Sequence, residues 1–130
     1  MDDKEQGLVT VPSRYSVPET LQRLLSIIAG KGLKIFTVVD HSGEAEKAGL
    51  AMRPTQLVIF GAPKGGTPVM VAAPTSAIDL PLKVLIWQHE SGESQVTFNT
   101  PEYLAGRHGI PDALVKNISG VGALVQKALE

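Results

Sequence analysis

Asp40 and His41 form the first pair of residues in the chain whose types suit chemistry. They stand side by side directly after a run of apolar residues. Histidine titrates near neutral pH, and a neighbouring carboxylate can orient it and stabilise its charge, so the pair suits general acid–base catalysis. A second interpretation is structural: Asp40 caps a helix that begins at Ser42, while His41 bonds to a nearby backbone carbonyl. The sequence leaves both interpretations open.

A second candidate segment runs from Gly61 to Pro68 and is the part of the chain richest in turn-forming residues. Its backbone amides, together with Lys64 and a helix that starts at Thr67, suit the binding of an anion. The segment is not a P-loop, because its lysine precedes the glycine pair instead of following it. The alternative is a tight turn that binds nothing.

The residue types that most often bind metals have no diagnostic spacing in this chain. They are the three histidines and the acidic residues nearest to them, namely His41, His89, His108, Glu44, Glu90 and Asp112. The chain has no cysteine, which excludes disulfides, thiolate metal sites and cysteine nucleophiles. A Gly-x-Ser-x-Gly elbow, typical of serine hydrolases, is also missing. We therefore expect no metal site and no cofactor.

Hydrophobic periodicity and turn residues predict the elements that position these candidates. Strands are expected at Leu8–Val11, Leu33–Val39, Leu57–Phe60, Leu82–Gln88 and Val96–Asn99, the second of them buried on both faces and the third central in the sheet. A helix capped by Ser16 runs to about Ile28, a short helix follows Asp40, and a third begins at Thr67. The chain is helical from Pro101 onward, with a break or a close backbone approach at Gly120 and Gly122.

This order, β-α-β-α-β-α-β-β-α, predicts a single α/β domain of the α+β type, with a mixed sheet of about five strands and helices packed on it. We expect a flexible tail at residues 1–7 and one domain over residues 8–130. Trp87, on the predicted hairpin, suits the core or a dimer interface.

Four separated blocks of the sequence resemble the family called domain of unknown function 302 (DUF302). They are Phe36–Ser42 with Ala45 and Ala48, Leu57–Pro63, Gly66–Met70 and Asp79–Val84. Ala62 stands where the family often has asparagine. The resemblance implies a compact α/β fold that assembles as a homodimer in bacteria and archaea, without an established activity.

The blocks converge on one cleft if the strands ending at Val39 and Phe60 are parallel neighbours and the strand from Leu82 runs antiparallel to them. The predicted ligand-binding residues of that cleft are Asp40, His41, Gly61, Pro63, Lys64, Gly65, Gly66, Thr67, Met70, Asp79 and Lys83. The catalytic candidates among them are Asp40 and His41.

Composition narrows the class of partner. The 130 residues include 12 Lys and Arg against 13 Asp and Glu, a net charge of −1, so nucleic acid is not an expected partner. No apolar run is long enough to span a membrane, and a cytoplasmic location is the default expectation. The sequence predicts a homodimeric binding or sensor module for a small ligand, which could be an anion. The alternatives are an enzyme that uses Asp40 and His41, and a structural or interaction module without a ligand.

Overall fold

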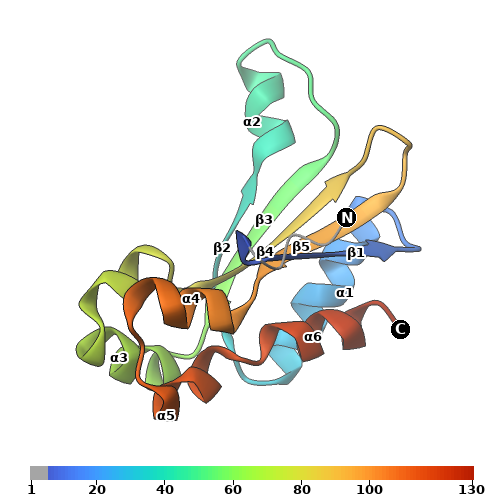
Figure 1. The fold of residues 1–130 in the computed structure, drawn as a ribbon. Coiled ribbons are helices and arrows are strands. Elements are labelled where there is room, and N and C mark those ends of the chain that lie inside the picture. Colours follow the sequence, from blue (N-terminus) through green and yellow to red (C-terminus); the bar gives the residue numbers. More distant parts are fainter. Residues whose placement is uncertain (1–5) are drawn as a thin grey trace.

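A computed structural model describes residues 6–130 of the chain. The described residues form five strands and six α-helices, and two 3₁₀ helices, η2 and η3, lie among them (Figure 1). The elements are β1 (Leu8–Ser13), α1 (Val17–Gly30), β2 (Lys34–Asp40), α2 (His41–Lys47), β3 (Thr55–Gly61), α3 (Pro63–Ala72), η2 (Pro74–Ile78), β4 (Leu82–Gln88), β5 (Ser94–Asn99), α4 (Pro101–His108), α5 (Asp112–Val115), η3 (Lys116–Ile118) and α6 (Val121–Ala128). The predicted α+β fold is confirmed.

The five strands form one sheet in the order β1-β5-β4-β3-β2. Every neighbouring pair runs antiparallel, so the sheet is antiparallel throughout instead of mixed. The predicted parallel pairing of β2 and β3 is wrong. The connection of α2 and residues 48–54 contains a helix and is long enough for a parallel crossover, so its length does not decide the strand direction.

The main core lies between one face of the sheet and the helices α1 and α6. The central strands contribute fully buried side chains to this core, namely Val58, Phe60, Val84 and Ile86, and Val96 of β5 joins them. Leu24 and Ile28 of α1 pack on these residues, as the apolar face predicted for that helix requires. Ser16 caps α1, its hydroxyl accepting a hydrogen bond from the Glu19 amide at 3.2 Å.

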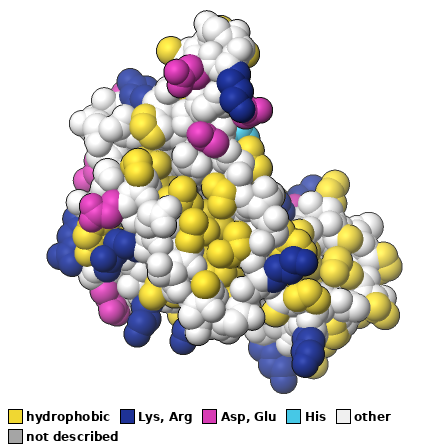
Figure 2. Space-filling view, turned by 180° about the vertical axis from the view of Figure 1, so that it is seen from behind, with side chains coloured by type: hydrophobic (Ala, Val, Ile, Leu, Met, Phe, Trp, Pro, Cys, Tyr) yellow, Lys and Arg dark blue, Asp and Glu magenta, His cyan; other side chains and the backbone are white. Residues whose placement is uncertain are grey.

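The opposite face of the sheet is also apolar. The strand registers place Val39, Leu57, Ile59, Leu85 and Trp87 on it, and all of them are half-buried. In Figure 2, hydrophobic side chains gather in the middle of one face of the molecule, over the strands. Trp87 therefore lies outside the main core, with its indole N–H donating to the Thr97 hydroxyl at 2.9 Å.

Strand β2 is the edge of the sheet, so the prediction that it is buried on both faces is wrong. It pairs with β3 alone, and Lys34, Phe36, Thr37 and Asp40 are exposed. Its apolar run resembled a central strand because valine and isoleucine are common in both. Beyond β2, the helix α2 projects from the body of the molecule, at the end of the sheet opposite to α3 (Figure 1).

Two helix predictions are corrected at their ends. Helix α3 begins at Pro63, four residues before the predicted start at Thr67, and carries Pro68 in its interior. Proline suits the first turn of a helix because its missing N–H has no partner there, and Pro63 occupies that place. The C-terminal region is broken into α4, α5, η3 and α6, and the break at Gly120 confirms the first of the two interpretations of the glycines.

The last helices and α3 form a second, smaller core. Its buried members are Val69, Ala73, Leu104, Ile110 and Ile118. This cluster, with Leu114 and Val115 packed against it, holds α3, α4, α5 and η3 together as a lobe at one end of the sheet (Figure 1). The predicted tail falls mostly outside the described residues, but Gly7 lies within them, and its carbonyl accepts a hydrogen bond from the Thr100 amide.

Replacement of a main-core residue tests this architecture. We expect Phe60→Ala to lower the free energy of unfolding by about 3–5 kcal/mol, because the side chain is fully buried and leaves a cavity. Urea unfolding followed by circular dichroism measures the change. The matched control is Leu57→Ala, in the same strand but on the half-buried face. Equal losses in the two variants would contradict the assignment of the core to the face of α1 and α6.

Candidate functional site: an apolar pocket at one end of the sheet

The antiparallel hairpin of β2 and β3 separates two groups of candidate residues. In its register Asp40 pairs with Gln56, whereas Gly61 pairs with Lys34 at the other end. Asp40 and His41 therefore lie at the end of the sheet from which α2 projects, called the tip below. The segment after Gly61 lies at the opposite end, beside the lobe. Within one chain the predicted convergence of these two groups is wrong.

The prediction that the segment before Leu82 lies beside the segment after Gly61 is confirmed. Because β4 runs antiparallel to β3, Leu82 pairs with Phe60, and the segment that precedes β4 lies beside Gly61. A pocket of about 280 Å³ opens there. Its lining residues are Phe36, Gly61, Ala62, Pro63, Gly66, Thr67, Met70, Leu80, Pro81, Leu82, Asn117 and Ile118. Five of the predicted ligand-binding residues are among them: Gly61, Pro63, Gly66, Thr67 and Met70.

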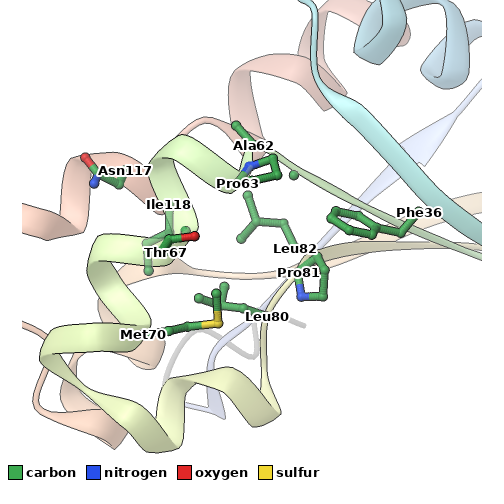
Figure 3. A pocket seen from close by; sticks show the side chains of 12 residues that line it. Phe36, Ala62, Pro63, Thr67, Met70, Leu80, Pro81, Leu82, Asn117 and Ile118 are labelled. Atoms are coloured by element: carbon green, nitrogen blue, oxygen red, sulfur yellow. The ribbon is translucent and has the colours of Figure 1, made fainter.

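Side chains from three parts of the fold form the pocket walls (Figure 3). Met70 of α3 points toward Leu80, while Phe36 of the edge strand lies beside Pro81. Ile118 of η3 closes the wall on the side of the lobe. The lining carries no charged side chain, and its polar side chains are the Thr67 hydroxyl and the Asn117 amide. Such a lining favours an uncharged, largely apolar molecule.

The glycines of α3 are part of a helix and not of an anion cradle. The amides of Gly65 and Gly66 both donate to the Ala62 carbonyl at 2.9 Å. The Gly65 carbonyl in turn accepts a hydrogen bond from the Asn117 side chain at 3.1 Å, which fastens α3 to η3. Lys64 is exposed and does not line the pocket.

A polar cluster centred on Asp79 lies behind the Leu80–Pro81 wall. The Asp79 carboxylate accepts from Arg107 at 3.0 Å and from His108 Nε2 at 2.5 Å. The other ring nitrogen of His108 lies 2.9 Å from the Thr75 hydroxyl. Both predicted site residues of this region, Asp79 and Lys83, thus act on the wall from outside the pocket. The cluster ties η2 to the end of α4.

Lys83 holds the backbone on both sides of Leu80. Its ammonium group donates to the carbonyls of Asp79 at 2.9 Å and Pro81 at 3.1 Å. Burial lowers the pKa of Lys83, and the nearby Asp79 carboxylate opposes this effect in part. Lys83 therefore positions the pocket wall and does not contact the interior of the pocket.

Arg107 and His108 were missed as site residues by the sequence interpretation, which considered His108 only with Asp112. Its actual partner, Asp79, is 29 residues away. No local spacing signals such a contact, because it is created by the packing of α4 against η2. Among residues 6–130 no group of three or more His, Asp and Glu side chains is placed to hold a metal ion.

At the tip, Asp40 is a helix cap. Its Oδ1 atom accepts hydrogen bonds from the Gly43 amide at 2.9 Å and the Ser42 hydroxyl at 3.0 Å. The helix starts at His41, one residue before the predicted start, and the His41 side chain is exposed. Neither the acid–base pair nor a bond from His41 to a carbonyl occurs among the described hydrogen bonds. None of the helices described over residues 6–130 has the length and apolar character required to cross a lipid bilayer.

The pKa of Lys83 generates a testable pH dependence. A lysine whose pKa is lower in the folded chain binds fewer protons there than in the unfolded chain, so folding gains stability as pH rises toward 10.5, the usual pKa. This gain is lost as pH falls through the lowered pKa. We expect the unfolding free energy of the wild type to rise relative to that of Lys83→Met as pH increases toward 10.5. Urea unfolding at each pH measures it, with Lys64→Met as the exposed control. Parallel pH profiles for all three proteins would contradict the assignment.

Comparison with known proteins supports a family for this fold. The DUF302 family, described as a domain of unknown function, matches residues 9–130. A crystal structure of an uncharacterised conserved DUF302 protein from Bacillus stearothermophilus superimposes with a TM-score of 0.78 over 95% of both chains, at 18% sequence identity. That likeness concerns the fold alone.

Longer relatives carry a different name. Proteins called "Fluoride-specific ion channel FluC 1" from Brucella suis and "FluC 2" from Brucella melitensis are each 41% identical over 128 residues, or 95% of this chain. The chain spans only about half of their length, 50% and 47% respectively. The match to the family over residues 9–130 is nearly complete, and the chain belongs to the DUF302 family.

Proposed function

We propose that the chain is a binding module for a small, uncharged and largely apolar molecule, held in the pocket between α3 and the ends of β2, β3 and β4. The observation that carries this proposal is the lining itself: a hollow of about 280 Å³ bounded by Phe36, Met70, Leu80, Pro81 and Ile118. Apolar surface brought out of water contributes about 25 cal/mol per Å² to binding. A charged ligand would lose its hydration there without meeting a countercharge.

The polar atoms of the pocket suit orientation of the ligand. The Thr67 hydroxyl can donate or accept and points into the pocket, whereas the Asn117 amide is bonded to the Gly65 carbonyl and points away from it (Figure 3). A ligand with one hydroxyl or carbonyl group at its edge would match Thr67. This composition, an apolar lining with a few polar groups, is typical of small-molecule sites.

Binding of a fluorescent apolar probe tests the proposal. We expect N-phenylnaphthylamine to bind the wild type with enhanced fluorescence, and Met70→Asp to weaken binding by at least about tenfold, because a carboxylate in the pocket must be desolvated. The control is Val71→Asp, the next residue of α3, which is 76% exposed and does not line the pocket. Circular dichroism verifies that both variants are folded. Equal probe affinity in the two variants, or no probe binding to the wild type, would refute the proposal.

A second candidate function is favoured by the longer relatives. In the Brucella proteins, a stretch similar to this chain shares a polypeptide with a further stretch of comparable length, under the name of a fluoride-specific ion channel. Joined domains commonly act in one process. The chain would then assist a fluoride-specific channel, with its pocket as the ligand-sensing part.

Deletion of the gene from its native host tests this second candidate. We expect the deletion strain to grow more slowly than its parent in millimolar fluoride, a concentration chosen as an order of magnitude for weak ion binding, and at the same rate without fluoride. Restoration by the wild-type gene but not by Met70→Asp would connect the effect to the pocket. Unchanged fluoride sensitivity would remove this candidate without affecting the pocket proposal.

A further inference from the structure

A bulge in β2 places an aromatic ring at the pocket. The pairing of β2 with β3 passes from Ile35 to Thr37 and leaves Phe36 as the extra residue without a partner on β3. Ile35 and Val38 both pack against the main core, whereas Phe36 lies outside that core and lines the pocket. Bulges are common beside functional sites, where they redirect a side chain. The bulge therefore explains why the edge strand contributes a phenylalanine to the pocket.

Two contacts fix the position of the Phe36 ring. The Lys34 ammonium, on the same strand, lies 5.0 Å from the ring centre, in a cation–π contact. The ring also lies close to the backbone of β3, because a Cβ atom added to Gly61 would be 3.9 Å from the Phe36 Cε2 atom. Phe36 is still 44% exposed, and Lys34 does not line the pocket. The pocket thus gains an aromatic surface without gaining a charge.

The other walls are also suited to a flat aromatic ring. Phe36 lies on one side of the pocket, with Thr67 and Met70 of α3 on the other (Figure 3). The face of an aromatic ring is partly negative and its edge is partly positive, so a ligand ring can stack on Phe36 and lie with its edge against the Met70 sulfur. Pro63 and Pro81 offer C–H groups to the face of such a ring. A saturated ring would meet the same apolar surface but would make none of these oriented contacts.

Volume and polarity set the size of the ligand. An apolar cavity of about 150 Å³ accommodates one benzene molecule. The pocket, at about 280 Å³, is nearly twice as large and accommodates two fused rings, or one ring with a substituent of similar size. The Thr67 hydroxyl points into it and suits one hydroxyl group on the ligand.

We propose that the pocket selects an uncharged aromatic molecule of one or two rings with one hydroxyl group, which stacks on Phe36 and forms a hydrogen bond with Thr67. This selectivity rests on the proposed binding function and narrows its ligand from apolar molecules in general to aromatic ones. Phe36 is the residue that determines the preference, because it supplies the aromatic face of the pocket.

A matched pair of alcohols tests the selectivity. 2-Naphthol and decahydro-2-naphthol have the same carbon skeleton and the same hydroxyl group, but only the first is aromatic. We expect the wild type to bind 2-naphthol at least about fivefold more tightly, and Phe36→Leu, which keeps an apolar side chain, to reduce this preference below about twofold. The control is Phe98→Leu, the same substitution in β5 and outside the pocket, which should keep the preference. Isothermal titration calorimetry measures the affinities, and circular dichroism verifies the fold.

The outcomes separate this selectivity from the pocket proposal. Equal affinity for the two alcohols, or a preference that Phe36→Leu leaves unchanged, would overturn the selectivity alone. So would the absence of 2-naphthol binding in a wild type that binds N-phenylnaphthylamine. A wild type that binds neither the alcohols nor N-phenylnaphthylamine would refute both proposals.

The ring current of a bound ligand locates it in the protein. We expect 2-naphthol to shift the methyl proton resonance of Met70 in NMR spectra, and decahydro-2-naphthol to shift it far less, because only the aromatic ligand has a ring current. Met52, which is 48% exposed at the tip and does not line the pocket, is the internal control. Equal shifts by the two alcohols, or a shift of Met52 as large as that of Met70, would overturn the proposed placement.

Thr67→Val tests the hydrogen bond with little change in shape. We expect the affinity for 2-naphthol to fall about fivefold, since the hydroxyl group of the ligand loses its partner, and the affinity for naphthalene to stay unchanged. Calorimetry measures both ligands. Equal losses for 2-naphthol and naphthalene, or no loss for either, would overturn the role of Thr67.

Discussion

The antiparallel register of β3 between β2 and β4 is the constraint on which the arrangement of the site depends. It pairs Val58 with Val38 on one side and with Val84 on the other, so that one face of three strands is buried under α1. A shift by one residue would turn these valines to the other face and bring Leu57 and Ile59 inward. The same register sends Gly61 to the end of the sheet that carries the lobe, and Asp40 to the projecting tip.

The lobe is attached to the sheet by a small core and a polar clamp. Val69, Leu104 and Ile118 pack the helices of the lobe together. Asp79 joins η2 to Arg107 and His108, while Lys83 bonds to the carbonyls on both sides of Leu80. The pocket between lobe and sheet stays open because its walls are held from behind by these contacts.

The edge strand β2 contributes to both the pocket and the free edge of the sheet. Phe36 belongs both to the pocket and to the free edge of β2, so anything that covers the edge also changes access to the pocket. Natural proteins protect free sheet edges by charges, bulges or partners. Here the bulge near Phe36 and the charges of Lys34 and Asp40 protect the edge from unspecific pairing.

Much of the fold follows from local patterns in the sequence. The capped amphipathic helix α1, the strands and the β4–β5 hairpin were predicted because apolar periodicity, proline and glycine act over a few residues. The same patterns also predicted that Asp79 lies beside the segment after Gly61. Where local signals competed, the prediction erred: Thr67 is a good cap, but Pro63 already starts α3.

Only the tertiary structure decided which candidates meet. Strand direction is set by chain reversal and by the packing of Val58 and Phe60 against α1, and neither leaves a local trace in the sequence. The contact of His108 with Asp79 and that of Asn117 with Gly65 span 29 and 52 residues, and both arise when the lobe folds against η2 and α3. The residue types of the site were therefore contained in the sequence, whereas their division between a pocket and a distant tip results from long-range packing.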